Sequence, residues 1–173
     1  MKKRKGPLVY KEVEIIDVGA EGKAIAKIDN MVVFVPYVAP GDIVDIRITK
    51  KRKQYMEGTP VFFHSYSSKR QQPVCRHFGI CGGCKWQHLP YHQQLYYKQK
   101  QVTEQFKHLG NIDVNTRAVI PSENTEYYRN KLEYTFSCQR WLLPSEMEIK
   151  DKNTNALGFH IPGRFDKILD IEH

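Results

Sequence analysis

Short apolar runs separated by turn-forming residues dominate the first third of the chain. There are five such runs, which cover residues 13–16, 24–28, 31–35, 43–48 and 57–63. Gly, Asn, Asp and Pro stand between most of them, as expected for short strands joined by tight turns. The third run is apolar at every position, which predicts a strand buried on both faces. Together the five runs predict an OB-like five-stranded β-barrel over residues 12–64.

A helical period follows the barrel. Residues 65–90 are polar or rich in glycine and cysteine, and we expect a linker and a loop there. Pro90 suits the start of a helix and Gly110 its end, which predicts an amphipathic helix over residues 91–110. The residues of its sparse stripe recur at helical spacing; they are Tyr91, Leu95, Lys98, Val102, Phe106 and Leu109.

The pattern of residues 111–173 favours β-structure. Apolar and polar side chains alternate over residues 132–138, which predicts a half-buried strand with Cys138 as a small core residue. Two more strands are expected over residues 156–161 and 168–171. The chain is therefore expected to be an α+β protein in which an antiparallel β segment forms part of a central domain.

Positive charge is the main compositional signal. The chain carries 27 Lys and Arg against 19 Asp and Glu, a formal net charge of +8. This balance favours a polyanionic partner, with nucleic acid ahead of an anionic membrane, and solubility is the alternative explanation. Residues 1–11, with five basic residues and no acidic one, are expected to form a basic arm.

Several residues could contact RNA. Basic side chains could bind phosphates, and aromatic side chains could stack on unpaired bases. The candidates of both kinds are Arg47, Lys50, Lys51, Arg52, Lys53, Tyr55, Arg76, Phe78 and Trp86. Lys69 and Arg70 extend the basic segment further along the chain. For each single residue, a solvated surface position or ordinary packing is the alternative interpretation.

No segment has the sequence of a membrane span or a secretory signal. The longest apolar runs fall well short of roughly 18 residues, and the basic amino terminus has no apolar stretch behind it. We therefore expect a cytoplasmic monomer without a membrane partner, whose cysteines stay reduced.

Three of the four cysteines form a C-x5-C-x2-C motif at Cys75, Cys81 and Cys84. Reduced thiolates so close together favour a soft metal centre. An iron–sulfur cluster and a structural zinc both require four ligands, and the motif supplies three. Zinc sites usually pair two C-x2-C knuckles, or one knuckle with two histidines, so the spacing fits zinc poorly.

Other residues of this region have supporting roles. Gly79, Gly82 and Gly83 are expected to allow tight turns with positive φ. His77, His88 and His173 are alternative fourth ligands, although surface or RNA-facing positions are their more ordinary interpretation.

The segment from Cys75 to Gln94 resembles the iron–sulfur segment of the S-adenosylmethionine-dependent RNA uracil-5-methyltransferases, which include enzymes of 23S ribosomal RNA. That family follows roughly the pattern C-x5-C-G-G-C-x-x-Q-H-L-x-Y-x-x-Q, and every fixed position is met here. Residues 12–63 resemble the family's TRAM domain, and Tyr128-Arg129-Asn130-Lys131 resembles its downstream Y-R-N-K segment.

The resemblance implies a cofactor and a reaction. A 4Fe–4S cluster would be held by the three cysteines of the motif, with a fourth cysteine expected just beyond His173. The implied reaction is C5 methylation of a uridine in ribosomal or transfer RNA by S-adenosylmethionine. In that family a cysteine attacks C6 of the uracil, C5 takes the methyl group, and a base removes the C5 proton.

The resemblance assigns no catalytic or cofactor-binding residue to this chain. We expect those residues in a later domain of a longer protein, and so we expect residues 1–173 alone to be inactive. A stand-alone RNA-binding module with a structural zinc is the alternative function. Iron with sulfide would favour the methyltransferase interpretation, whereas stoichiometric zinc would favour the zinc module.

Overall fold

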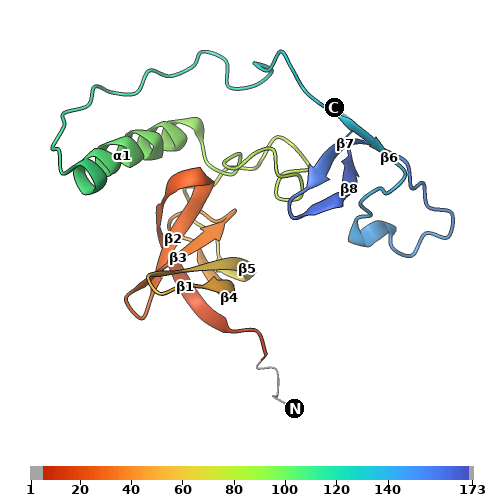
Figure 1. The fold of residues 1–173 in the computed structure, drawn as a ribbon, viewed down its shortest axis with the longest axis horizontal. Coiled ribbons are helices and arrows are strands. Elements are labelled where there is room, and N and C mark those ends of the chain that lie inside the picture. The colour runs from red at the N-terminus through yellow and green to blue at the C-terminus, as the bar shows by residue number, and fades with distance from the viewer. Residues whose placement is uncertain (1–5, 172–173) are drawn as a thin grey trace. The chain divides into compact units, whose positions relative to one another are not determined.

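The computed structural model describes residues 6–171 and divides into two compact units. The first unit holds the chain up to Gln72 together with Lys85–Glu123, and the second holds Pro73–Cys84 together with the chain from Asn124 onward. Each unit has its own sheet (Figure 1). The start of the expected basic arm and His173, one of the alternative fourth ligands, lie outside the described residues.

The first unit is built on a closed five-stranded barrel. Its strands are β1 (Val9–Val18), β2 (Lys23–Ile28), β3 (Met31–Pro36), β4 (Ile43–Lys51) and β5 (Tyr55–Ser65). A short 3-10 turn, η1 (Ala20–Gly22), joins the first two strands. The order around the barrel is β1-β2-β3-β5-β4; β3 and β5 pair in parallel, and β1 closes the barrel against β4. The predicted OB-like barrel is therefore confirmed (Figure 1).

The barrel core follows from the two-residue period of its strands, which sends alternate side chains inward. Its buried residues include Ile15, Ala24, Ala26, Val33, Val35, Val44, Ile46 and Met56. The expectation that residues 31–35 are buried on both faces is wrong, because only Val33 and Val35 are buried. A small closed barrel has a single interior face, so the remaining apolar side chains lie nearer the surface. The last residues of the expected basic arm, 9–11, belong to β1.

The helix α1 (Tyr91–Gly110) confirms the helical prediction, and Pro90 directly precedes it. Its end differs from expectation, because Asn111 rather than Gly110 adopts the left-handed conformation, with φ of 50°. The Asn111 backbone N–H donates to the Phe106 carbonyl, which satisfies one of the open acceptors of the last turn.

The expected apolar stripe of α1 is largely exposed. Val102, Phe106 and Leu109 all lie at the surface. The buried residue is instead Tyr97, which belongs to one apolar cluster with Val18, Ala39 and Leu89. Tertiary partners decide this burial, because Tyr97 is the residue of α1 that packs into this cluster. Within residues 6–171, no helix combines the length and apolar character needed to cross a membrane.

The second unit contains a three-stranded antiparallel sheet. Its strands are β6 (Thr135–Ser137), β7 (Ala156–Ile161) and β8 (Arg164–Asp170), in the order β6-β7-β8, and a 3-10 turn η2 (Pro144–Glu146) lies between the first two. The buried side chains are Ala156, Ile161, Ile168 and Leu169. Gly158 brings β7 close to β8, because any Cβ at this position would overlap the Leu169 backbone carbonyl.

The prediction for residues 132–138 is only partly right. A strand forms, but it is confined to Thr135–Ser137. The expected core position of Cys138 is wrong, since this residue is exposed. The same face leaves Phe136 82% exposed, because no described element covers that side of β6. Alternation defines two faces of a strand, but it could not tell which of them is covered.

Candidate nucleic-acid interface and cysteine loop

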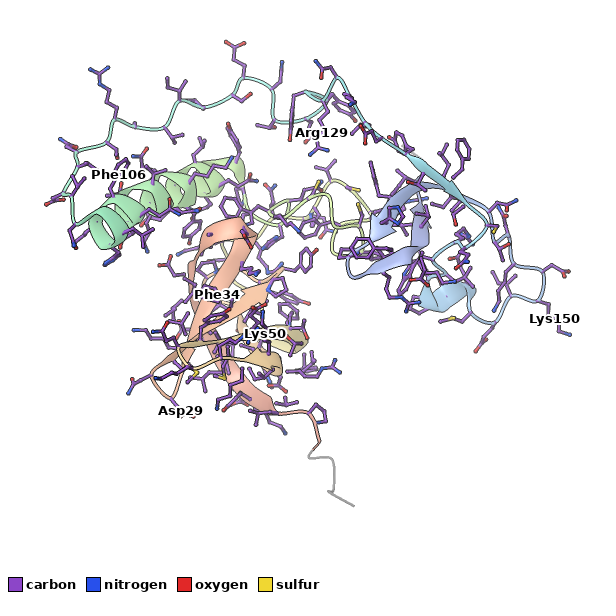
Figure 2. The ribbon with its side chains drawn as sticks, in the orientation of Figure 1. Asp29, Phe34, Lys50, Phe106, Arg129 and Lys150 are labelled. Atoms are coloured by element: carbon purple, nitrogen blue, oxygen red, sulfur yellow. The ribbon has the colours of Figure 1, made fainter. Side chains whose placement is uncertain are left out.

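The turn between β4 and β5 carries the densest positive charge of the barrel. Lys50, Lys51, Arg52 and Lys53 are all exposed there, and we call these four residues the basic hairpin. Lys50 is less available than the others, because its Nζ lies 3.1 Å from the Glu57 carboxylate. That hydrogen bond also lowers the pKa of Glu57. Figure 2 marks Lys50 on the barrel.

Two more candidates of the first unit lie near this turn. Arg47 is exposed on β4, and Tyr55 is half-buried at the start of β5. The Tyr55 ring packs edge-on against Phe34, with 5.7 Å between the ring centroids. Tyr55 is therefore held by packing and offers only part of its ring to a partner.

Arg70 has a different role from the one its sequence position suggested. Its guanidinium forms a bidentate ion pair with Asp42, with Nε 2.9 Å from Oδ1 and Nη2 2.9 Å from Oδ2. The Asp42 side chain is completely buried. It also accepts the backbone N–H groups of Ala39 and Ser67, at 2.6 and 2.9 Å. Arg70 thus links the chain after β5 to the barrel, and its charge is neutralised by the ion pair with Asp42.

An aromatic stack lies beside this ion pair. The rings of Phe63 and Tyr66 are nearly parallel, at 20°, with centroids 4.8 Å apart. The guanidinium carbon of Arg70 is 5.3 Å from each ring centroid, within the range of a cation–π contact. This cluster was not predicted from the sequence, although three aromatic residues within residues 62–66 were a usable signal.

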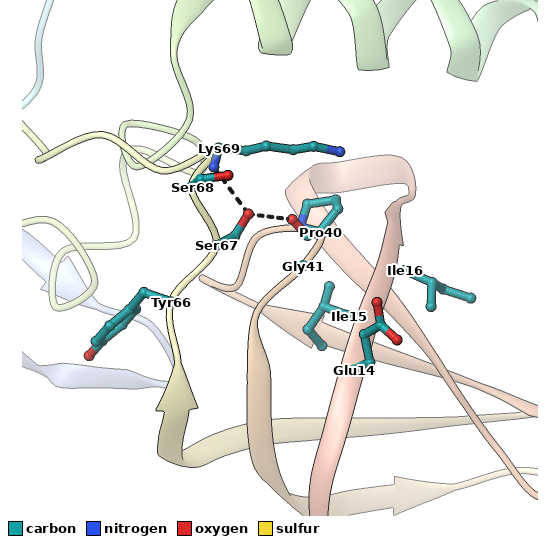
Figure 3. A pocket seen from close by; sticks show the side chains of 9 residues that line it. All are labelled: Glu14, Ile15, Ile16, Pro40, Gly41, Tyr66, Ser67, Ser68 and Lys69. Carbon is teal, nitrogen blue, oxygen red and sulfur yellow. Dashed lines mark hydrogen bonds between the residues drawn. The ribbon is translucent and has the colours of Figure 1, made fainter.

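An open cavity of about 430 Å³ lies next to the stack. Its walls come from β1, from the turn before β4 and from the chain that follows β5 (Figure 3). The residues that line it are Glu14, Ile15, Ile16, Pro40, Gly41, Tyr66, Ser67, Ser68 and Lys69. The Ser67 hydroxyl donates to the Pro40 carbonyl at 2.7 Å, which fixes one wall of the cavity.

The cysteine loop, residues 73–84, folds on itself through backbone hydrogen bonds. The N–H groups of Ile80 and Cys81 both donate to the His77 carbonyl, and Phe78 and Cys81 form an isolated β-bridge. Gly79 has the expected positive φ, at 87°. Gly82 instead allows the loop backbone to lie close to Pro162, in the turn between β7 and β8, because a Cβ at residue 82 would overlap the proline ring.

Two of the sulfur atoms accept hydrogen bonds from the loop backbone. The His77 N–H donates to Cys75 Sγ and the Gly83 N–H donates to Cys81 Sγ, both at 3.4 Å. Within residues 6–171, however, no three Cys, His, Asp or Glu side chains are gathered as a metal-binding group. The three cysteines share a loop, but the structure does not assemble them as ligands.

The histidines of this region are buried, contrary to the expectation of surface or RNA-facing positions. His77 is 6% exposed in the second unit, and His88 is 1% exposed in the first. His88 Nε2 lies 3.2 Å from the Val38 carbonyl, so this nitrogen carries the proton. Trp86 packs against the apolar cluster around Leu89, so at least part of its ring serves the fold. Arg76 and Phe78 belong to the second unit, and Arg76 is exposed there.

The burial of His88 predicts that stability depends on pH. Burial lowers the pKa of His88 below its ordinary value of 6.5. Between that lowered pKa and about 6.5, the unfolded chain therefore binds more protons than the folded chain. Above pH 6.5 this effect does not reduce the free energy of unfolding. As the pH drops from 6.5 toward the folded-state pKa of His88, the free energy of unfolding decreases. Urea titrations at pH 7.5 and 5.5 measure this loss.

A pair of variants assigns the effect to His88. The variant His88→Gln, which cannot titrate, should lose less stability between the two pH values than the wild type. The exposed neighbour His92 provides the control, and His92→Gln should keep the wild-type loss. An equal loss in wild type and His88→Gln would contradict the prediction.

Comparison with known proteins agrees with the sequence resemblance. The family model of the TRAM domain matches residues 10–61, which coincide with the barrel. A protein of Bacteroides thetaiotaomicron, named as an uncharacterized RNA methyltransferase, is 53% identical over 156 residues, 88% of this chain and 34% of that protein. The 23S rRNA (uracil(1939)-C(5))-methyltransferase of Francisella tularensis subsp. novicida is 37% identical over 69% of this chain and 27% of its own length.

The chain contains a TRAM domain and is homologous to proteins named as RNA methyltransferases, among them a 23S rRNA (uracil(1939)-C(5))-methyltransferase. It spans about a third of the length of three of these curated relatives, at 34 to 36%. The crystal structure of the Pyrococcus abyssi tRNA (uracil-54, C5)-methyltransferase with S-adenosyl-L-homocysteine has the same fold over 94% of this chain and 32% of that one. The TM-score is 0.53 at 23% identity, so this likeness concerns the fold alone.

Proposed function

We propose that this chain is the RNA-binding and cluster-bearing part of an S-adenosylmethionine-dependent RNA uracil-C5 methyltransferase. The observation that carries the proposal is the exposed basic hairpin on a barrel that matches the TRAM domain. The substrate would be a uridine of ribosomal or transfer RNA, as the names of the relatives suggest. Consistent with that role, we propose a cytoplasmic monomer.

The chemistry of methyl transfer is proposed to reside outside these residues. A nucleotide-type cofactor site usually begins with closely spaced glycines between a strand and a helix, and no two of the 11 glycines here stand two residues apart. The part played by residues 1–173 would be to bind and orient the RNA.

We further propose that Cys75, Cys81 and Cys84 hold a 4Fe–4S cluster, with a fourth cysteine ligand beyond His173. The support is chemical, since three thiols lie within ten residues and two of them accept backbone N–H groups. When bound, the cluster would tie the sulfur atoms of the loop to iron and fix the loop conformation. Arg76 and Phe78 lie within this loop, so the cluster would also hold these two candidate RNA contacts in place.

The RNA-binding part of the proposal is tested by the salt dependence of affinity. Purified residues 1–173 should bind a uridine-containing single-stranded RNA with an affinity that falls steeply with salt. Each phosphate contact that is lost should reduce the slope of log K against log salt by about 0.7. We therefore expect that reduction for Lys51→Ala, Arg52→Ala and Lys53→Ala, measured by fluorescence anisotropy at several salt concentrations.

Two further variants sharpen this test. Lys50→Ala should change the slope less, because Lys50 already pairs with Glu57, and Glu57→Gln should release Lys50 and steepen the slope. Lys107, exposed on α1, provides the control, so Lys107→Ala should leave the slope unchanged. Salt-independent binding, or equal slopes in all variants, would refute phosphate binding by the hairpin.

A further inference from the structure

Tyr66 is a large aromatic side chain held at the surface. It is 68% exposed although its ring stacks on Phe63. Phe63 covers one face of the ring and the Arg70 guanidinium lies 5.3 Å from its centroid, so the exposed area belongs to the part of the ring that these two side chains leave open. An exposed ring backed by a second ring is the usual platform on which single-stranded RNA stacks its bases.

The platform is fixed in place before any ligand arrives. Ser67, the next residue, donates its backbone N–H to the buried Asp42 and its hydroxyl to Pro40. Arg70 contacts both rings while its guanidinium is bound to Asp42. A ring held by so many contacts loses little conformational entropy on binding, so stacking on it costs less than stacking on a free tyrosine.

The neighbouring cavity supplies room and charge for a nucleotide. Its volume of about 430 Å³ lies within the range of small-molecule sites. Lys69 lines the same cavity as Tyr66, and its ammonium group can pair with a phosphate (Figure 3). Glu14 lies on β1 at the other side, where its carboxylate would accept from a base amino or imino group but repel a phosphate (Figure 3).

We propose that Tyr66, backed by Phe63, stacks on one unpaired base of the bound RNA, with Lys69 contacting the adjacent phosphate. This inference rests on the proposed RNA-binding function and names a contact that is separate from the basic hairpin. Stacking is indifferent to salt, whereas phosphate pairing is not. The two contributions can therefore be measured apart.

The experiment uses a single-stranded RNA of about ten nucleotides that contains one 2-aminopurine. Stacking on Tyr66 should quench the fluorescence of the 2-aminopurine on binding to residues 1–173. Tyr66→Ala should abolish the quenching and weaken binding about 5- to 150-fold, the range for one stacked base, while leaving the salt slope unchanged. Tyr66→Phe should retain both quenching and affinity.

Two more variants make the result decisive. Tyr66→Leu keeps an apolar side chain against Phe63 but has no flat ring. It should lose as much affinity as Tyr66→Ala, and it therefore tests stacking even if the alanine variant disturbs the fold. Tyr96 on α1, 59% exposed and outside the cavity, is the matched control, and Tyr96→Ala should bind as the wild type does. Salt-dependent binding with undiminished quenching in Tyr66→Leu would overturn the stacking site alone. Absence of RNA binding by the wild type would overturn the proposed function as well.

Discussion

Replacing Asp42 with alanine is expected to destabilise the barrel unit by about 3–5 kcal/mol, as is usual when one partner of a buried ion pair is removed. The Asp42 side chain is completely buried. Its loss would leave the Arg70 guanidinium and the N–H groups of Ala39 and Ser67 without their acceptor, in a place that water reaches poorly. Urea unfolding of the wild type and of Asp42→Ala at neutral pH measures the difference.

The double variant and a surface pair provide the controls for Asp42. Asp42→Ala combined with Arg70→Ala should be less destabilised than the sum of the single variants, because no unpaired charge remains. Glu57→Gln removes a carboxylate of the same barrel whose ion pair with Lys50 is exposed, and it should have a much smaller effect. If Asp42→Ala cost less than about 1 kcal/mol, the range of exposed pairs, the anchoring role would be disproved.

The barrel could be predicted from the sequence because its signal is local. Short apolar runs and turn residues define five strands without reference to the rest of the chain. Burial within these elements was less predictable. Val102 and Phe106 follow the helical period, yet Tyr97 is the residue buried in α1, where it packs with Val18, Ala39 and Leu89. Periodicity defines a face, and only the tertiary fold decides what covers it.

Some parts of the candidate site could likewise be predicted from the sequence, and others could not. The basic hairpin was predictable, because exposed charges clustered in one turn need no partner to stay at the surface. The pairing of Asp42 with Arg70 was not, because 28 residues separate them and the contact forms only when the chain after β5 folds back onto the barrel. The Tyr66 platform depends on that same return of the chain. Sequence analysis therefore assigned Arg70 to RNA, whereas its guanidinium is bound to a buried carboxylate.

Variants of the cysteine loop are expected to have the largest effect on the iron content of the protein. After anaerobic reconstitution with iron and sulfide, residues 1–173 should bind an iron–sulfur cluster that is lost quickly in air, because this chain provides three of the four thiolates. Cys81→Ala should reduce bound iron to the background level, since two thiolates cannot hold the cluster. Iron and sulfide analysis, together with visible absorption, measures the result.

Cys138 is the matched control for Cys81, because it is the only other cysteine of the chain and lies exposed beyond β6. Cys138→Ala should keep the iron content of the wild type and change stability little, as expected for a surface thiol. Equal loss of iron in both variants would mean that Cys138 is also a ligand and would overturn its assignment as a surface thiol. Stoichiometric zinc without iron in the purified wild type would refute the cluster and favour a structural zinc, since the same three thiolates can serve either metal.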